Sequence, residues 1–477
     1  MSLARVMIAA PASGSGKTLV TCGIIQALVN RGMKVSSFKC GPDYIDPTFH
    51  SRVIGARSRN LDCFFCTDST LRYLFTRSAE PSDISVIEGV MGFYDGIRAS
   101  VTEGSSYDVS QKLEAPVVLL VNARGSSTSC IPVIKGFKEF RENRMEGVIL
   151  NNMNASLFPD IKRAVEGELG LKVIGYVPKL EGVSLESRHL GLVMPDEIAS
   201  LRDDLNRVAA TLEETLDIDM LIGIARAAPP IAGEAPAHGV LEEKVRVGFA
   251  LDDAFCFNYE DNIALLEECG AEIVYFSPIN DSKLPEGISG LILSGGYPEL
   301  HCAELSANRQ MLTDIKEKIA GGMPCLAECG GFMYLHRVLK DRDGKAWPMV
   351  GVVDGESADT GKLTRFGYVS LSSSDPDSII AGGAKGHEFH YWDSTANGDS
   401  WNAVKTSGKA YRCGHEEGSL AAGFPHLYYY SNPDAAYRFL LRCQAYSNLR
   451  SDVDVAEQVA RKAGDRHGDG QAEEEHR

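Results

Sequence analysis

The sequence has no apolar run long enough to span a bilayer, and its first residues lack the pattern of a signal peptide. It also lacks an excess of basic residues, because its 477 residues carry a formal net charge of −17. That charge argues against non-specific binding to nucleic acid, although it is compatible with a local basic site for an anionic ligand. We therefore expect a cytoplasmic protein that binds neither membranes nor nucleic acid.

Paired cysteines at metal-binding spacing are absent as well. The 12 cysteines are scattered, and the close pair Cys63 and Cys66 has no second pair to complete a zinc site. Buried thiols are therefore expected, with zinc or redox chemistry at this pair as the alternative. We find no repeat of solenoid length, and the length of the chain predicts two or three domains.

Residues 1–225 alternate short apolar runs with amphipathic stretches. This alternation predicts a parallel sheet covered by helices on both faces. Residues 226–243, rich in Ala, Pro, Gly and Glu, are typical of a linker. A second α/β domain is expected over 244–447, followed by a charged tail at 448–477 that we expect to be disordered. The expected strands are Val6–Ala10, Val35–Lys39, Ser85–Glu88, Val117–Val121, Gly147–Asn151 and Lys172–Tyr176, then Val245–Ala250, Ile273–Phe276, Gly290–Leu293 and Pro324–Ala327.

A glycine-rich turn follows the first expected strand and precedes a helical pattern. This order is typical of a P-loop, in which backbone N–H groups cradle phosphate oxygens. Lys17 would neutralise the β and γ phosphates, and the Thr18 hydroxyl would hold Mg²⁺. Pro11 stands where the usual first glycine would be, and an ordinary helix start is the alternative. The predicted ATP-binding residues are Ser13, Gly14, Ser15, Gly16, Lys17 and Thr18.

Four acids lie at or shortly after the ends of the next two expected strands. Each alone could cap a helix or form a turn, but four beside a P-loop favour Mg²⁺–ATP and phosphoryl transfer. Glu88 directly follows an apolar pair, as a Walker-B acid does. Lys39 could meet an anionic substrate or the transferring phosphate. The four acids are Asp43, Asp46, Glu88 and Asp95.

Cys329 occupies a turn between an apolar strand and a helical pattern. This is the layout of a nucleophile elbow built with cysteine, and we expect an exposed thiol whose pKa is lowered by the helix N-terminus. The Gly330 N–H could stabilise an oxyanion, and the glycine turn after Leu293 could supply a second N–H. A buried structural cysteine in a glycine-rich turn is the alternative.

A thiol nucleophile needs a base, and histidine is the usual choice. His426 is the best placed by sequence, with His387 and His390 as rivals. These two rivals could instead be a metal pair, although no third ligand has a clear spacing.

Together the motifs resemble the cobyrinate a,c-diamide synthase family, the corrin-ring amidases of cobalamin biosynthesis, over roughly residues 4–445. Ala12 stands where the deviant P-loops of the MinD type have lysine, and Tyr428 stands where other amidotransferases have a third catalytic carboxylate. The segments that carry the resemblance are Ser13–Thr18, Phe38–Pro47, Glu88–Gly96, Glu186–Leu192, Gly386–Tyr391 and the turn at Cys329.

The resemblance implies a dethiobiotin-synthetase-like P-loop domain followed by a class I glutamine amidotransferase-like domain, and a carbon–nitrogen ligase activity. Cys329 would attack glutamine with His426 as base, while the N–H groups of Gly296 and Gly330 hold the oxyanion. ATP would phosphorylate a carboxylate of a cobyrinate-type tetrapyrrole, and ammonia would displace phosphate. The implied Mg²⁺ ligands are Thr18, Asp43 and Glu88, and the implied groups on the carboxylate side are Tyr44, Asp46 and Asp95.

Three alternatives stay open at this point. Nickel-sirohydrochlorin a,c-diamide synthases share the chemistry and nearly the same motifs, and hydrogenobyrinate is a further candidate substrate. A P-loop ATPase with a non-catalytic amidotransferase-like binding domain is the remote alternative, against which the Cys329 turn and His426 argue. Which of Asp43 and Asp46 binds Mg²⁺, and the oligomeric state, do not follow from the sequence.

Overall fold

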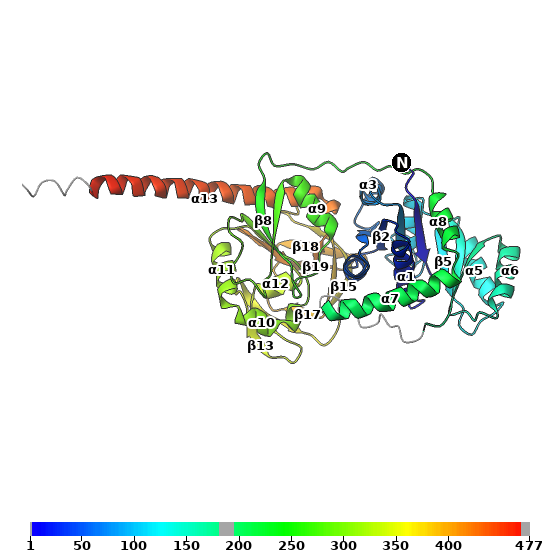
Figure 1. Ribbon diagram of the computed structural model, residues 1–477. Coiled ribbons are helices and arrows are strands. Elements are labelled where there is room, and N and C mark those ends of the chain that lie inside the picture. Colours follow the sequence, from blue (N-terminus) through cyan, green and yellow to red (C-terminus); the bar gives the residue numbers. More distant parts are fainter. Residues whose placement is uncertain (1, 181–194, 469–477) are drawn as a thin grey trace, which may run out of the picture.

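The first unit of the fold is a seven-stranded parallel sheet in the order β3-β2-β4-β1-β5-β6-β7. The computed structural model describes residues 2–180 and 195–468 and places two α/β units side by side (Figure 1). The first unit's strands are β1 (Arg5–Ala9), β2 (Val35–Cys40), β3 (Arg57–Leu61), β4 (Ile84–Glu88), β5 (Val117–Asn122), β6 (Met145–Asn151) and β7 (Lys172–Val177).

Helices cover both faces of this sheet, as the alternating pattern predicts. Val6 and Ile8 of β1 join an apolar cluster with α1, α7 and α8, while Met7 and Ala9 join another with α3 to α6, because successive strand residues point to opposite faces. The helices are α1 (Lys17–Asn30), α2 (Ile45–Phe49), the π-helical turn η1 (His50–Ile54), α3 (Asp68–Ala79), α4 (Ser106–Lys112), α5 (Cys130–Glu139), α6 (Phe158–Leu169), α7 (Pro195–Thr215) and α8 (Ile218–Arg226).

The second unit is built on a six-stranded sheet in the order β20-β21-β11-β10-β8-β9. All its neighbours are parallel except β20, which is antiparallel to β21. The strands are β8 (Val245–Ala250), β9 (Ala271–Phe276), β10 (Gly290–Leu293), β11 (Cys325–Glu328), β20 (His415–Glu417) and β21 (Leu420–Gly423). Its helices are α9 (Glu260–Cys269), η2 (Pro298–Leu300), α10 (Cys302–Ala307), α11 (Arg309–Ala320), α12 (Gly330–Tyr334), η3 (Tyr429–Ser431) and α13 (Pro433–Gly468).

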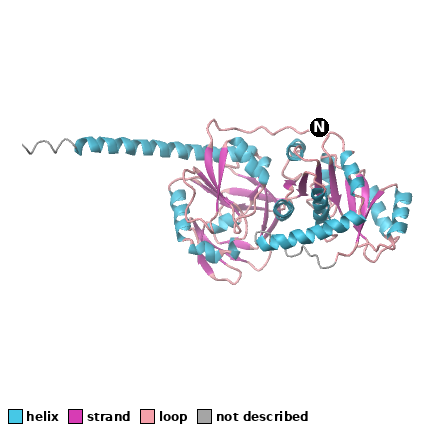
Figure 2. Ribbon diagram, viewed as in Figure 1, coloured by secondary structure: helices cyan, strands magenta, loops and turns pink. Residues whose placement is uncertain are grey.

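Two smaller sheets complete the second unit, and their strands are drawn in magenta with those of the six-stranded sheet in Figure 2. A four-stranded sheet has the order β13-β12-β14-β17, and a five-stranded antiparallel sheet has the order β19-β18-β15-β16-β22. We call the latter the five-stranded sheet. Their strands are β12 (His336–Lys340), β13 (Ala346–Pro348), β14 (Val353–Asp359), β15 (Arg365–Ser372), β16 (Ala384–His390), β17 (Trp392–Ser394), β18 (Trp401–Lys405), β19 (Ala410–Cys413) and β22 (His426–Leu427).

Residues 229–242 contain no helix or strand and run from α8 to β8. This connection packs on both units: Arg5 donates a hydrogen bond to Pro229 O at 2.9 Å, and Gly233 lies against the backbone of Arg72 and Tyr73. A Cβ added at Gly239 would lie 2.4 Å from the Tyr437 ring of α13. The connection is therefore held along its length.

The charged C-terminal stretch differs from the expectation of disorder. Helix α13 continues through residues 448–468 and leaves the body of the molecule (Figure 1). Residues such as Ala456, Glu457 and Lys462 have high helix propensity, which explains why a charged, weakly apolar stretch is helical. Residues 469–477 and the Glu186–Leu192 motif lie outside the described residues. Within the described ranges, no helix combines the length and apolar character needed to cross a membrane.

Candidate active site

The P-loop follows β1 and leads directly into α1. Gly14 and Gly16 have φ values of 74° and 85°, a left-handed conformation that glycine adopts at little cost. Asn151, at the end of β6, donates a hydrogen bond from Nδ2 to Ser15 O at 2.8 Å. A Cβ added at Gly16 would lie 2.6 Å from the same nitrogen, so a larger residue would displace this contact. Ser13 is exposed, and the Ser15 hydroxyl donates to Ala12 O at 2.7 Å.

Lys17 and Thr18 connect the start of α1 to the region after β4. Lys17 Nζ donates to Met91 O at 2.5 Å, and Thr18 Oγ1 donates to Glu88 Oε1 at 2.6 Å. Burial lowers the pKa of Lys17, and the neighbouring Lys39 lowers it further. The structure thus brings together the predicted phosphate-binding lysine, the predicted metal-binding hydroxyl and the Walker-B-like acid.

A buried ion cluster lies beside the P-loop at the ends of β2 and β4. Lys39 Nζ lies 2.5 Å from Asp46 Oδ2 and 2.7 Å from Glu88 Oε1. Burial alone would lower the pKa of Lys39, but Glu88, Asp46 and Asp43 outweigh it and raise that pKa. Burial raises the pKa of Glu88, opposed by Lys39. The cluster therefore has more acids than bases, which suits a site that receives a cation.

Asp43 and Asp95 make local turns. Asp43 Oδ1 accepts hydrogen bonds from the N–H groups of Ile45 and Asp46 at 2.8 and 3.2 Å, and so fixes the start of α2. Its other oxygen lies 4.0 Å from Lys39 Nζ, and burial raises the pKa of Asp43 to about 6, with Asp46 adding to the effect. Asp95 Oδ2 accepts from Gly92 N at 2.9 Å, so it shapes the loop after β4.

Cys329 forms a strained turn between β11 and α12. Its φ of 48° and ψ of −105° lie in a region that residues other than glycine rarely adopt. A Cβ added at Gly330 would lie 3.0 Å from Gly296 N, so the two predicted oxyanion donors come from adjoining backbone. A Cβ added at Gly331 would lie 2.1 Å from Leu293 O. The predicted elbow geometry is present, including the close approach of strand β10.

The prediction of an exposed thiol with a lowered pKa is wrong. Cys329 is only 6% exposed, and burial raises its pKa, with Glu299 adding to the effect and the Gly330 N–H opposing it. Helix α12 has five residues, Gly330–Tyr334, so its N-terminus gives a limited field. Desolvation of the thiolate therefore outweighs the helix.

His426 lies on β22, against the glycine turn that adjoins Cys329. A Cβ added at Gly295 would lie 2.2 Å from His426 Cε1. Burial lowers the pKa of His426 to about 3, with His387 and His390 adding to the effect. His387 is its partner across β16, whereas the His390 ring stacks on Phe424 with centroids 4.0 Å apart. Among the described residues, no three His, Cys, Asp or Glu side chains are grouped as a metal site.

Glu328 and Asn151 are two site residues that sequence reasoning missed. Glu328, the last residue of β11, places Oε2 at 4.0 Å from His426 Nδ1, and burial raises its pKa to about 8. Its position directly before Cys329 was the available signal, because a strand end beside a nucleophile faces the same site. Asn151 comes 133 positions after Thr18 in sequence, and its role depends on tertiary contact alone.

The two halves of the site meet at Tyr44. Its ring centroid lies 5.1 Å from that of His426, 4.6 Å from that of Tyr259 and 5.2 Å from that of Phe257. Tyr44 lies in the same short segment as Asp43 and Asp46 of the ion cluster. The region of Cys329 and His426, which we call the thiol–histidine site, therefore adjoins the ion cluster across the boundary between the two units.

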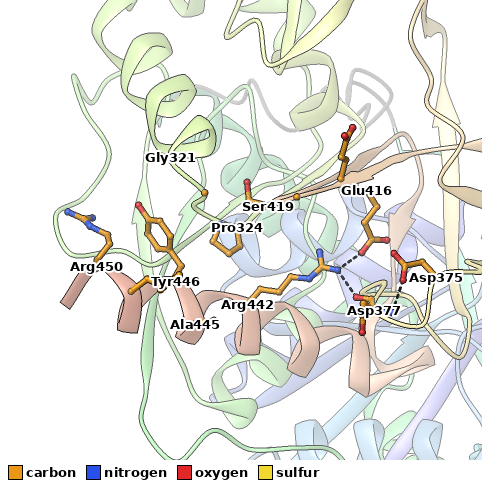
Figure 3. Close-up of a pocket in the computed structure, with 14 residues that line it drawn as sticks. Gly321, Pro324, Asp375, Asp377, Glu416, Ser419, Arg442, Ala445, Tyr446 and Arg450 are labelled. Carbon is orange, nitrogen blue, oxygen red and sulfur yellow. Dashed lines mark hydrogen bonds and ion pairs between the residues drawn. The ribbon is translucent and has the colours of Figure 1, made fainter. Parts of the chain in front are cut away.

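A cavity of about 910 Å³ lies elsewhere, between α13 and the edge formed by β20 and β21 (Figure 3). Arg442 crosses it to Glu416 at 2.8 Å. This cavity is lined by Pro324 at the N-terminal end of β11, whereas Cys329 follows the C-terminal end of the same strand. It therefore takes no part in the site described above.

Comparison with known proteins gives matches to both units. Residues 6–193 match the CobQ/CobB/MinD/ParA nucleotide binding domain, and residues 246–431 match the CobB/CobQ-like glutamine amidotransferase domain. The chain is 38% identical over 449 residues to the cobyrinate a,c-diamide synthase of Caldanaerobacter subterraneus subsp. tengcongensis, covering 92% of this chain and 98% of that protein. The synthases so named from Thermoplasma volcanium and Picrophilus torridus are 37% and 38% identical, covering 94% and 93% of this chain and 99% of each relative.

Proposed function

This chain belongs to the cobyrinate a,c-diamide synthase family, and from this premise we propose that it uses ATP and glutamine to amidate the a and c carboxylates of cobyrinate. The observation that carries the proposal is the contact of Tyr44 with His426, with ring centroids 5.1 Å apart. It joins a glutamine-cleaving site to a phosphate-binding site, as an enzyme needs if ammonia made at one is used at the other.

Ammonia release uses Cys329 and His426. Cys329 Sγ attacks the carboxamide carbon of glutamine while His426 takes the thiol proton, and the N–H groups of Gly296 and Gly330 hold the oxyanion. The C–N bond then breaks, His426 gives its proton to the leaving ammonia, and water hydrolyses the thioester to glutamate. Burial keeps the thiol and the imidazole neutral before glutamine binds, so the proton moves as the C–S bond forms and not before it.

Carboxylate activation uses the P-loop half. A carboxylate oxygen of the tetrapyrrole attacks the γ-phosphorus of ATP, and the bond to the ADP oxygen breaks. Lys17 and the backbone N–H groups of Ser13–Thr18 bind the phosphates, and Lys39 faces the transferring group. Ammonia then attacks the acyl carbon and phosphate leaves. The acyl-phosphate is needed because a free carboxylate is a poor electrophile.

The oxygen ligands beside the P-loop fit Mg²⁺. Glu88 Oε2 is buried, accepts no hydrogen bond within the described residues and lies 3.7 Å from His50 Nε2, and Thr18 Oγ1 lies 2.6 Å from the other oxygen of the same carboxylate. Magnesium prefers one or two carboxylates together with phosphate oxygens and water. Thr18, Glu88 and Asp43 would hold the ion, with Asp46 as the alternative to Asp43. The ion would neutralise charge on the β and γ phosphates.

We assign the two halves of the reaction to two domains. Residues 1–225 form the amidoligase domain, 244–447 the amidotransferase domain and 226–243 the linker, followed by the tail at 448–477. The separate sheets of the two units support this division. We expect the reaction in the cytoplasm, where ATP and glutamine are both supplied.

The test is an amidation assay on purified protein with ATP and Mg²⁺, read by mass spectrometry of the tetrapyrrole. Cobyrinate, hydrogenobyrinate and nickel-sirohydrochlorin are compared, each with glutamine or with ammonium salt. We expect diamide from cobyrinate with either nitrogen source. Preference for another macrocycle would change the substrate and leave the chemistry, whereas no amide on any of the three would refute the proposal.

Two variants separate the halves. Cys329→Ser should lose glutamine-dependent amidation and keep the ammonia-dependent reaction, because only the glutaminase half uses the thiol. Lys17→Ala should lose both but retain glutamine hydrolysis. Continued use of glutamine by Cys329→Ser would show that the nucleophile is another residue.

A further inference from the structure

One face of the five-stranded sheet carries a continuous row of rings. His426 pairs with His387 across β22 and β16, and His387 in turn pairs with Tyr368 on β15. One step further along, Phe366 pairs with Phe389. Centroid distances of 5.8 Å between Tyr368 and His387, and 5.9 Å between His387 and Phe366, show that these rings share a face. The row therefore begins at the glutaminase base and runs across the sheet.

The P-loop domain covers the inner part of this row. Tyr368 OH donates a hydrogen bond to Asp62 Oδ2 at 2.6 Å, and the Tyr368 ring stacks on Phe64 with centroids 4.5 Å apart. A Cβ added at Gly41 would lie 3.9 Å from Tyr368 OH. Gly41 directly follows β2, whose Lys39 belongs to the ion cluster. The covered part of the row thus ends at the rim of the phosphate-transfer site.

The outer part of the row is uncovered. Phe366 is 62% exposed, Phe389 51% and Tyr391 45%. The three rings lie next to one another: the centroid of Phe389 is 5.6 Å from that of Phe366 and 6.0 Å from that of Tyr391. Leu363 and Val404, also exposed, lie on the adjoining loop and strand. We call Phe366, Phe389 and Tyr391 the aromatic ledge.

A ledge of this kind is costly to leave in water and is typical of a binding surface. The other exposed aromatic side chains of the described residues lie on different elements from the ledge. Tyr275 lies on β9, the edge strand of the six-stranded sheet, and Phe140 follows α5. The ledge differs because it continues a row of rings into the boundary between the two domains. Its occupant must therefore have a broad apolar face and a polar group that reaches inward.

We infer that the aromatic ledge binds one face of the tetrapyrrole macrocycle, so that a peripheral carboxylate extends past Tyr368 to the ion cluster. This inference rests on the proposed function, which supplies the macrocycle. The planar ring system would stack on the three side chains, whose faces and edges favour such contact. The exposed Lys362 lies beside the ledge and complements the other carboxylates at the macrocycle edge.

The test combines Phe366→Ala with Phe389→Ala in the full-length enzyme. The matched control is Tyr275→Ala, which removes an exposed ring from the six-stranded sheet of the same domain. We expect the KM for cobyrinate to rise about tenfold in the double variant, because two ring contacts are lost. The KM values for ATP and glutamine, and glutamine hydrolysis without tetrapyrrole, should stay within about twofold of the parent. Phe366→Trp should retain a low KM.

Equilibrium binding of cobyrinate without ATP, followed by its visible absorbance, gives a readout independent of turnover. A weakened affinity in the double variant but not in the control supports the inference. If the parent amidates cobyrinate and the double variant keeps both its KM and its affinity, the ledge is not the macrocycle site. If, in addition, sedimentation shows a change of oligomeric state, the ledge is a contact between copies. If the parent amidates no tetrapyrrole, the proposed function itself fails.

Discussion

Carboxylates surround the thiol–histidine site. Glu299 and Glu328 both influence Cys329, and burial raises their pKa values to about 7 and about 8. Because these acids gain protons more readily than usual, the site is held close to neutral. A neutral site costs less free energy to bury than a charged one. The dominant influence at this scale is thus desolvation.

Glu328 gives a pH prediction for stability. Its folded pKa of about 8 exceeds the ordinary value of 4.5, so the folded protein keeps a proton that the unfolded chain releases between these values. The contribution of this proton to the free energy of unfolding is fully present below pH 4.5 and is lost as the pH rises through about 8. Glu328→Gln keeps a neutral side chain at every pH. Its melting temperature relative to the parent should therefore rise by a few °C between pH 5 and pH 8.5, measured by thermal melting across that range.

The matched control is Glu317→Gln, which changes an exposed glutamate on α11. Its melting temperature should follow the parent at each pH. A Glu328→Gln curve parallel to that of the parent would show that Glu328 is ionised in the folded protein across the range.

The sequence identifies site residues that belong to contiguous patterns. The loop Ser13–Thr18 and the turn at Cys329 are such patterns, because a strand, a glycine turn and a helix follow one another along the chain. Asn151 and Glu328 act through partners that lie far away in sequence, Ser15 and His426. The protonation state of Cys329 also depends on packing from other elements. A sequence therefore suggests the nucleophile but not its charge.

Apolar runs in the sequence predict the central strands of the seven-stranded and six-stranded sheets, but they do not predict the edge strands. The parallel strands such as β1 and β5 are buried on both faces, which favours continuous apolar sequence. Strand β3 was missed because Arg57–Leu61 contains four polar residues, one of which, Asn60, bonds the Gly41 and Asp43 carbonyls. The five-stranded sheet was also missed. One of its faces meets the other domain, so its aromatic and histidine content gave no simple alternation.

The loop between β8 and α9 provides a prediction at the scale of elements. Phe257 on this loop packs on Tyr44 and Tyr297, with ring centroids 5.2 and 4.8 Å away, and its N–H donates to Gly295 O. It therefore closes the boundary beside His426. Phe257→Ala should open this boundary to water, so that ammonia escapes. Glutamine hydrolysed per amide formed should rise from about one to several, measured as glutamate against diamide.

Ammonia supplied as a salt should drive amidation equally well in the parent and in Phe257→Ala, because the ion cluster is untouched. Tyr275→Ala serves again as the control and should keep the parent ratio. An unchanged ratio in Phe257→Ala would mean that ammonia passes by another route.

At the scale of the whole molecule, the placement of the two units is the part that sequence cannot give. The separate domains follow from composition and from the linker-like stretch. Their boundary depends on contacts such as Tyr368 with Asp62 and Arg59 with Asp261, which join β3 and the loop after it to β15 and α9. An apolar cluster crosses this boundary and includes Phe65 and Tyr428, whose rings stack 4.9 Å apart. This docking places Tyr44 of the first unit against His426 of the second.

Truncation within helix α13 gives a prediction about which part of the helix the folded molecule needs. Its first turns bury Phe439, Leu440 and Cys443, and a Cβ added at Gly290 would lie 2.2 Å from Cys443 Sγ. Its later part projects from the body (Figure 1). A chain that ends after Arg450 should therefore keep the parent melting temperature and both nitrogen-dependent activities. A chain that ends after Arg438 loses three buried side chains and should be destabilised by about 5 kcal/mol, measured by denaturant unfolding.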